Sequence, residues 1–358
     1  MSKTLTKTLM VMAGGTGGHV YPAMAVADYL QAEGWRIVWL CTEGGMENRL
    51  IEGKGYSKAM IHMQGVRGKG LLGWVLLPVK LVKAFSQSMS ALKKHQPNVV
   101  LGMGGFAAFP GGLMAKLLGK PLVIHEQNSV AGLTNKVLAK LATRVLAAFP
   151  AAFGDKAALV GNPVRADIAH LPEPEQRFAG REGALRLLVV GGSLGAHALN
   201  EVIPQALAKL PPEHRPQVVH QSGVKHLEVL KNNYEKAGVA VDARAFIDDM
   251  AGMYAWADFV ICRSGALTVA EVSAVGLGAL MVPFPFAVDD HQTTNAAYLA
   301  EAGAAILVQQ KTLSVEKLAE ILRSLDREQC LDMAKKARTL GKPDATANVA
   351  AVCKELAK

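Results

Sequence analysis

Short runs of consecutive hydrophobic residues, several of them rich in Val and Ile, recur along the chain and alternate with longer stretches of helical spacing. A short uninterrupted apolar run is typical of a strand that is buried on both faces of a sheet. Strands that alternate with helices favour a parallel, doubly wound α/β sheet. The predicted strands cover residues 9–13, 37–41, 99–101, 122–124, 145–147, 187–190, 218–220, 241–245, 259–262, 278–282 and 304–307.

A strand, a glycine-rich loop and a helix follow one another twice in the chain. One loop, residues 14–19 (GGTGGH), follows the first predicted strand, and another, residues 191–197 (GGSLGAH), follows a strand of the second half. We therefore predict two similar domains, residues 1–163 and 164–342, whose sheets face each other across a cleft. In folds of this kind, ligands bind at the carboxyl ends of the strands.

Size and charge narrow the class of protein. Half of the 358 residues are hydrophobic, which is enough for more than one core. The net charge of +9 indicates an anionic partner, which can be nucleic acid, an acidic bilayer or a phosphorylated small molecule. Aromatic residues make up only 6% and do not interleave with Lys and Arg, so we expect no nucleic acid partner.

Neither the cysteines nor the apolar runs indicate a special compartment. The four cysteines lie far apart, without a C-x-x-C pair or matching His spacing, so we predict buried, reduced thiols and no metal site. The apolar run 9–13 is too short for a signal peptide, and glycines and prolines interrupt the uncharged stretch 272–288. We expect neither export nor a membrane span.

Both glycine-rich loops have the features of a phosphate-binding turn. A strand that ends in glycines before a helix lets the backbone approach a phosphate, and the helix N–H groups favour its charge. Neither loop matches a nucleotide triphosphatase motif, and Val20 stands where a dinucleotide-binding motif has its third glycine. A nicotinamide-dependent dehydrogenase stays open as an alternative because Glu43 ends the second strand, where such an enzyme has its ribose-binding acid. Another alternative is a tight turn that binds no ligand.

His19 is the candidate general base. It opens the helix that follows the first glycine-rich loop, and an imidazole titrates near neutral pH. The alternative is a histidine that caps the helix by donating to a nearby carbonyl group.

A further helix start, in the segment 263–271, suits a nucleotide diphosphate. Ser264 is placed to cap this helix, and Gly265 permits a ligand to approach its N-terminus. Glu271 follows more than one turn later, where its carboxylate can accept both hydroxyl groups of a ribose; an exposed helical glutamate is the alternative. The candidates for nucleotide binding on this helix are Ala266, Leu267, Thr268, Val269, Ala270 and Glu271.

Polar side chains also gather after two other strands. The segment 289–295 contains the amides Gln292 and Asn295, which suit sugar hydroxyl groups. For the acidic pair that begins it, we predict a helix cap ahead of a metal site. Glu126 and Asn128 follow another buried strand and indicate a ligand contact at the same edge of the sheet.

The segment 71–85 is very apolar and has basic residues around it. A helix of this kind can lie in a bilayer interface and attract anionic lipids. The alternative is a core helix with solvated lysines. The predicted membrane contacts are Trp74, Leu77, Lys80, Leu81 and Phe85.

Through the order and spacing of these motifs, nearly the whole chain resembles the peptidoglycan GlcNAc transferases of glycosyltransferase family 28, in the GT-B superfamily. The motifs that carry the resemblance are residues 14–19, 125–128, 191–196, 263–271 and 292–295. The resemblance implies two Rossmann-like domains, with the C-terminal segment 343–358 packed back on the first. It also implies a reaction that needs neither a cofactor nor a metal.

The activity implied by the resemblance is inverting transfer of GlcNAc from UDP-GlcNAc to the MurNAc 4-hydroxyl of lipid I, an undecaprenyl-pyrophosphoryl-linked muramyl pentapeptide. The products are lipid II and UDP. Such an enzyme serves cell-wall synthesis, cell shape and cell division from the cytoplasmic face of the inner membrane, as a peripheral protein. The implied partners are both substrates, the anionic membrane surface and other cell-wall synthesis proteins. A non-catalytic nucleotide-sugar-binding membrane adaptor remains an alternative.

The same resemblance implies that the C-terminal domain holds the donor. Arg165 and the backbone of Ile247 are then near the nucleotide, and Ser193 is near the phosphates. Glu271 binds the ribose, and Gln292 binds the sugar.

For the first glycine-rich loop, the resemblance implies a place at the acceptor diphosphate and the reaction centre. His19 is then the base or an orienting group for the acceptor hydroxyl, and Glu126 is the other candidate base. The residues that reach the donor sugar across the cleft are Thr16, Gly17, Gly18 and Asn128. The further reaction-centre candidates are Gly15 and Asn295.

Overall fold

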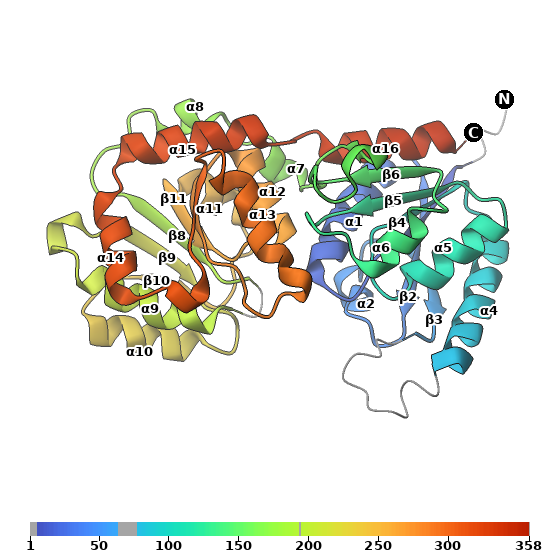
Figure 1. The fold of residues 1–358 in the computed structure, drawn as a ribbon, viewed down its shortest axis with the longest axis horizontal. Helices are drawn as coiled ribbons and strands as arrows, with labels where there is room; N and C mark the ends of the chain where they lie inside the picture. The colour runs from blue at the N-terminus through green and yellow to red at the C-terminus, as the bar shows by residue number, and fades with distance from the viewer. Residues whose placement is uncertain (1–5, 64–76, 193–194, 358) are drawn as a thin grey trace. The chain divides into compact units, whose positions relative to one another are not determined.

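The computed structural model describes residues 6–63, 77–192 and 195–357. The chain forms two compact units, one made of Met1–Arg165 with Asp344–Lys358 and the other of Ala166–Pro343 (Figure 1). Each unit contains one parallel sheet with helices packed on it. The predicted α/β class with two doubly wound parallel sheets is confirmed.

The first unit contains a seven-stranded sheet in which every neighbouring pair is parallel, in the order β3-β2-β1-β4-β5-β6-β7. Its central strands β1 and β4 are buried throughout, which agrees with their nearly continuous apolar sequences. The strands are β1 (Thr8–Met12), β2 (Arg36–Thr42), β3 (Ser57–Ile61), β4 (Val99–Gly102), β5 (Leu122–Glu126), β6 (Arg144–Ala147) and β7 (Ala158–Leu159).

Alternate residues of β1 enter two different cores, one on each face of this sheet. Leu9 and Val11 pack in the cluster that includes α1 and α16, whereas Met10 and Met12 pack in the cluster that includes α4 and α5. The last helix of the chain therefore completes the core of the first unit (Figure 1). The helices of this unit are α1 (Gly17–Ala32), α2 (Glu47–Leu50), α4 (Leu77–His95), α5 (Ala108–Leu117), α6 (Leu133–Leu138) and α16 (Ala345–Leu356).

The second unit contains a six-stranded parallel sheet in the order β10-β9-β8-β11-β12-β13. Its strands are β8 (Arg186–Val190), β9 (Gln217–Gln221), β10 (Asp242–Arg244), β11 (Phe259–Cys262), β12 (Gly278–Met281) and β13 (Ala305–Leu307). Its helices are α7 (Ala166–Ala169), α8 (Pro174–Phe178), α9 (His197–Ala208), α10 (Leu227–Ala237), α11 (Met250–Trp256), α12 (Ala266–Val275), α13 (His291–Ala300), α14 (Val315–Ser324) and α15 (Arg327–Leu340).

In each sheet, the strand order reverses once. The reversal lies between β1 and β4 in the first unit and between β8 and β11 in the second. Open parallel sheets bind ligands at such a point, at the carboxyl ends of the strands. The loops that matter most are therefore those that follow β1, β4, β8 and β11.

Every predicted strand is present, with its ends shifted by at most two residues. Two strands were not predicted, and both lie at an edge of the first sheet. β3 alternates exposed and buried residues over most of its length, and β7 has only two residues, both exposed. β3 begins with Ser57 and Lys58 and therefore lacks a continuous apolar run, whereas β7 is too short to be recognised as a strand.

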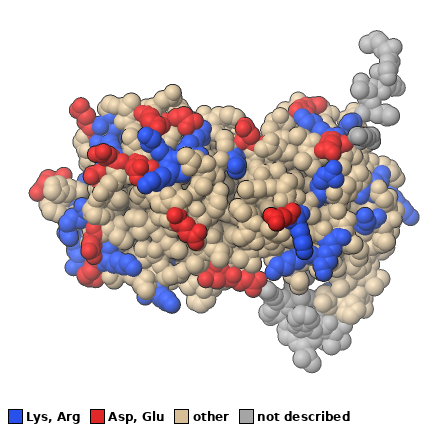
Figure 2. Space-filling view, turned by 45° about the horizontal axis from the view of Figure 1, so that its top comes forward, with Lys and Arg blue, Asp and Glu red and all other residues tan. Residues whose placement is uncertain are grey.

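The cysteines confirm the prediction of buried thiols, since Cys41, Cys262, Cys330 and Cys353 are all buried and free. Burial raises the pKa of the Cys262 thiol to about 12. None of the helices in the described ranges combines the length and the hydropathy that a membrane span requires. On the face shown in Figure 2, Lys and Arg side chains are spread over both units with Asp and Glu side chains among them.

Candidate active site

The first glycine-rich loop connects β1 to α1. Gly15 has a φ of +84°, in the left-handed region that favours glycine, and Thr16 is the extended residue immediately before the helix. Gly14 is buried, Gly15 and Thr16 are exposed, and Gly17 and Gly18 are half-buried in the first turn of α1. The residues predicted to meet the acceptor diphosphate are thus at the ligand-binding edge of this sheet.

His19 is held by the loop that precedes it. Its Nδ1 lies 3.0 Å from the carbonyl oxygen of Gly14 and 3.4 Å from the hydroxyl oxygen of Thr16. Because a carbonyl oxygen only accepts, Nδ1 is the protonated nitrogen of the neutral ring, and Nε2 carries the lone pair. His19 therefore donates to a nearby carbonyl group, but this group precedes α1 and the bond is not a helix cap. The neutral ring then has its lone pair on Nε2.

The loop after β4 packs closely on the first glycine-rich loop. A Cβ atom at Gly105 would lie 2.5 Å from the carbonyl oxygen of Gly14, and one at Gly104 would lie 3.0 Å from His19 Nε2. Both glycines also have positive φ. The loops that flank the reversal point of the first sheet therefore meet at His19, and only glycine at these two positions permits it.

Glu126 orders the loop that follows β5. Its Oε1 accepts from the backbone N–H of Asn128 at 3.0 Å, and its Oε2 accepts from the backbone N–H of Gly132 at 3.1 Å. The side-chain amides of Asn128 and Asn135 donate to the same carboxylate at 3.3 and 2.8 Å. Only 2% of the Glu126 surface is exposed, and both carboxylate oxygens already accept hydrogen bonds within the loop. This favours His19 over Glu126 as the base.

The second glycine-rich loop connects β8 to α9, which begins at His197. A Cβ atom at Gly195, where φ is +77°, would lie 1.9 Å from the carbonyl oxygen of Ser222, so the loop lies directly on the end of β9. Ser193, the residue implied near the phosphates, lies outside the described residues.

Gln221, the last residue of β9, connects two segments implied in donor binding. Its Nε2 donates to the carbonyl oxygen of Gly192 at 3.0 Å, and its Oε1 accepts from the backbone N–H of Ile247 at 3.0 Å. Ile247 itself is buried. Gln221 was missed in the sequence because a single amide at a strand end carries no motif, and only the pairing of β9 with β8 brings it to the loop.

The helix α12 begins differently from the prediction. Its N-cap is Gly265, without a side-chain cap, so the prediction that Ser264 caps it is wrong. Ser264 is fully buried, and its hydroxyl has no hydrogen-bond partner among the described residues. Because Gly265 is extended and has open space at its Cβ position, the start of α12 is accessible at the reversal point of the second sheet. This helix start contains the predicted Ala266, Leu267 and Thr268, and Val269 and Ala270 complete its second turn.

Glu271 is oriented from a neighbouring helix. The hydroxyl of Tyr254, on α11, donates to Glu271 Oε2 at 3.0 Å, and only 9% of the Glu271 surface is exposed. This excludes the alternative of an ordinary exposed helical glutamate. A carboxylate fixed on one side by a buried tyrosine suits the recognition of two adjacent hydroxyl groups.

The polar segment at α13 forms hydrogen bonds to the loops that follow β11 and β12. Gln292 Oε1 accepts from the backbone N–H of Phe284 at 2.9 Å, and the fully buried Asn295 donates to the carbonyl oxygen of Ser264 at 3.2 Å. Asp290 occupies the predicted N-cap position, but its carboxylate accepts from the Thr293 hydroxyl and caps no backbone N–H. In the described ranges, no group of His, Cys, Asp and Glu side chains has the arrangement of a metal site.

Arg165, implied near the nucleotide, is exposed. It is the last residue of the first of the two segments that form its unit.

The predicted membrane contacts lie on or near α4. Leu77, Lys80, Leu81 and Phe85 are half-buried, and the Phe85 ring packs on Phe109 with centroids 5.9 Å apart. Trp74 lies outside the described residues.

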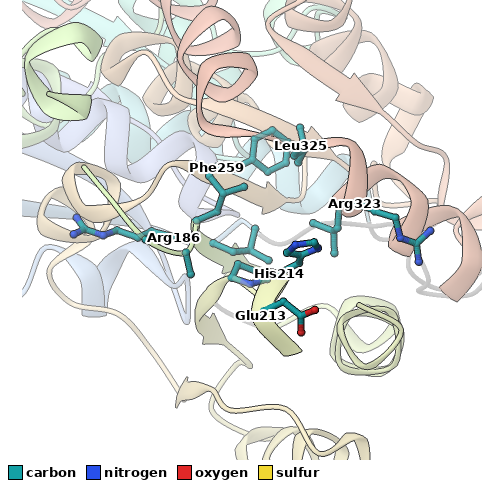
Figure 3. A pocket seen from close by; sticks show the side chains of 12 residues that line it. Arg186, Glu213, His214, Phe259, Arg323 and Leu325 are labelled. Atoms are coloured by element: carbon teal, nitrogen blue, oxygen red, sulfur yellow. The ribbon is translucent and has the colours of Figure 1, made fainter. Parts of the chain in front are cut away.

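A cavity of about 330 Å³ lies at the other edge of the second sheet, where β8 and β11 begin. Leu187, Phe259 and Leu325 give it an apolar wall, and His214 also lines it (Figure 3). In Figure 3, the guanidinium groups of Arg186 and Arg323 point away from this space. Because parallel sheets bind ligands at their carboxyl edge, this cavity is distinct from the candidate active site.

The chain matches the glycosyltransferase family 28 N-terminal domain over residues 9–147 and the glycosyltransferase family 28 C-terminal domain over residues 186–349. A relative from Burkholderia thailandensis is 60% identical over 355 residues, which cover 98% of this chain and 96% of the relative. A relative from Burkholderia pseudomallei is 59% identical with the same coverage. Both are named UDP-N-acetylglucosamine–N-acetylmuramyl-(pentapeptide) pyrophosphoryl-undecaprenol N-acetylglucosamine transferase.

Solved structures agree with this similarity. A crystal structure of Acinetobacter baumannii MurG is 42% identical and superposes with a TM-score of 0.87, covering 98% of this chain and 99% of that one. The calicheamicin glycosyltransferase CalG4 is only 18% identical, with a TM-score of 0.67, and shares the fold alone. The predicted GT-B class is confirmed.

Proposed function

Because the chain belongs to glycosyltransferase family 28, we infer that it transfers GlcNAc from UDP-GlcNAc to lipid I and releases lipid II and UDP. The observation that carries this activity is 60% identity, over 98% of the chain, to relatives named for this transfer. It is a step of peptidoglycan synthesis. A dehydrogenase and a non-catalytic adaptor are both disfavoured by this kinship.

The proposed chemistry is a single displacement with inversion. His19 Nε2 takes the proton of the acceptor 4-hydroxyl group as its oxygen attacks the anomeric carbon of GlcNAc. The bond between that carbon and the β-phosphate oxygen breaks, and UDP leaves with its electron pair. The bond from Nδ1 to Gly14 supports this role because it holds the ring in the tautomer that has a lone pair on Nε2.

For the second unit, we propose a donor site at the carboxyl ends of its strands. The diphosphate lies at the start of α12 and at Ser193, where helix N–H groups stabilise the negative charge that develops on UDP. The Tyr254 bond supports Glu271 as the ligand of the ribose hydroxyl groups. Gln292 binds the sugar, and the nucleotide lies near Arg165 and the Ile247 backbone.

For the first unit, we propose a site for the acceptor diphosphate at Gly15, Thr16, Gly17 and Gly18. The exposed position of Gly15 and Thr16 supports this assignment. Asn128 contacts the donor sugar, and Glu126 keeps the Asn128 backbone in place for it. Asn295, whose amide is bonded to Ser264, acts on the reaction centre by supporting the start of α12.

We also propose that the protein works at the cytoplasmic face of the inner membrane as a peripheral protein, where it meets other cell-wall synthesis proteins. Val79 and Val82 of α4 have 69% and 68% of their surface exposed, and Lys80 and Lys83 lie between and beside them. An apolar strip with adjacent lysines suits the interface of an anionic bilayer. Because Phe85 packs on Phe109, Val79 and Val82 are stronger candidates for bilayer contact than Phe85.

The activity is tested by incubation with UDP-GlcNAc and a lipid I analogue. We expect UDP release together with a disaccharide-linked lipid product. UDP-GlcNAc binding without product would favour the adaptor, and saturable NADH binding would favour the dehydrogenase.

A further inference from the structure

A buried carboxylate lies against the first glycine-rich loop. Glu47, the first residue of α2, has 0% of its surface exposed. Its Oε1 accepts hydrogen bonds from the backbone N–H of Thr42 at 2.8 Å and from the Thr42 hydroxyl at 2.6 Å. Its Oε2 is also buried and has no hydrogen-bond partner among the described residues. An incompletely bonded buried carboxylate costs folding free energy, and such groups are often retained for a function.

Two glycines make room for this carboxylate. A Cβ atom at Gly14 would lie 3.0 Å from Glu47 Oε2, and one at Gly45 would lie 2.2 Å from Glu47 Oε1. Gly14 is also the residue whose carbonyl oxygen lies 3.0 Å from His19 Nδ1. One peptide unit therefore separates the buried carboxylate from the imidazole of the proposed base.

We propose that Glu47 is a positioning residue for His19 and acts through Gly14. This inference rests on the proposed function. The two Thr42 bonds fix the carboxylate at the end of β2, where it packs beside Gly14 and limits the position of that residue. The Gly14 carbonyl group in turn sets the direction and the tautomer of the His19 ring.

The first test compares Glu47→Gln with Glu43→Gln. Glutamine keeps the shape of Glu47 but removes its charge and turns an amide group toward Gly14. We expect kcat to fall about tenfold to a hundredfold, because a misplacement of about 1 Å at a reacting group has this effect. The KM for UDP-GlcNAc should stay unchanged. Glu43 is a matched control because it follows the same strand and its carboxylate is 62% exposed, so its variant should keep wild-type turnover.

A double-mutant cycle with His19→Ala separates positioning from a general structural role. If Glu47 acts through His19, Glu47→Gln should cause no further loss of kcat once His19 is alanine. Losses that multiply would overturn the proposal, and so would wild-type kcat in Glu47→Gln alone. Wild-type turnover is measured in the same assay, so a failure of the proposed function is recognised separately, by the absence of product from the wild-type protein.

A second pair of variants keeps the proposal testable should Glu47→Gln not fold. Thr42→Val removes the hydroxyl that bonds Oε1 and preserves the shape of the side chain, whereas Thr42→Ser retains the hydroxyl. We expect Thr42→Val to lower kcat by severalfold without changing the KM for UDP-GlcNAc, and Thr42→Ser to retain wild-type kcat. Equal kcat in the two variants, with circular dichroism spectra like that of the wild type, would contradict a positioning role for Glu47.

Discussion

The side chain of Gln221 accepts a hydrogen bond from the backbone N–H of Ile247 at 3.0 Å. Its amide nitrogen donates to Gly192, so one side chain fixes both the second glycine-rich loop and the segment proposed beside the nucleotide. Gln221 is itself buried, which makes both bonds sensitive to substitution. The two segments proposed for the donor site are therefore held together by an amide that belongs to neither of them.

Replacing Gln221 with Leu should weaken donor binding. The substitution keeps the approximate volume and leaves the Ile247 N–H and the Gly192 carbonyl group without their bonds. Each buried group left unpaired costs about 1–3 kcal/mol, so we expect the KM for UDP-GlcNAc to rise about tenfold or more, with a smaller change in kcat. Steady-state kinetics with varied UDP-GlcNAc measures both constants. As a control, Gln205→Leu, on the exposed side of α9, should change neither.

Replacing His19 with Ala should remove the base without disturbing the donor site. General-base catalysis contributes about a hundredfold to ten-thousandfold, so we expect kcat to fall within this range. UDP-GlcNAc binding, measured by calorimetry, should be unchanged because the proposed donor residues lie mainly in the second unit. Undiminished turnover would exclude His19 as the base and would favour Glu126 instead.

His19 and Gln221 also show what the sequence can and cannot predict. The glycine-rich loop, the helix after it and His19 are neighbours in the chain, so a local pattern was enough to identify them. Gln221 and Glu47 contact residues that only folding brings to them: Gly192 through the pairing of β9 with β8, and Gly14 through the pairing of β2 with β1. No spacing within the chain records such contacts.

The start of α12 shows a different limit. Serine before a helix predicts a cap, yet Ser264 is buried and Asn295, from α13, bonds its carbonyl oxygen. Tertiary packing therefore overrode a local preference. The core strands of both sheets were predictable because burial on both faces requires continuous apolar runs, whereas β3 and β7 lie at an edge, where this requirement is absent.

Membrane association should depend on the exposed strip of α4. Changing both Val79 and Val82 to Gln removes its apolar side chains while leaving the buried face of α4 intact. We expect binding to vesicles that contain anionic lipid to fall by about tenfold, given about 25 cal/mol per Å² of apolar surface. Co-sedimentation measures it. Val229→Gln, at a half-exposed valine on α10 of the second unit, is the matched control; equal binding by all variants would contradict a role for α4.

Two buried histidines should make stability depend on pH. Burial lowers the pKa of His125 to about 4 and that of His220 to about 3, from an ordinary value of 6.5. Both rings are therefore neutral in the folded protein at pH 5, whereas in the unfolded chain they are mostly protonated. The unfolded state binds more protons, so stability falls as the pH decreases below about 6.5.

The magnitude of this effect can be tested on His220. Its ring is bonded to the Tyr234 hydroxyl and to Asn200 Oδ1, both at 3.0 Å, so protonation would place a charge in a buried site and reverse the bond from Tyr234. Between pH 7 and pH 5, we expect each histidine to lower the free energy of unfolding by about 2 kcal/mol. His220→Gln should lower stability at pH 7 but should flatten the pH dependence of the second unit's unfolding, followed by urea titration. A slope equal to that of the wild-type protein would mean that His220 is not neutral in the folded state.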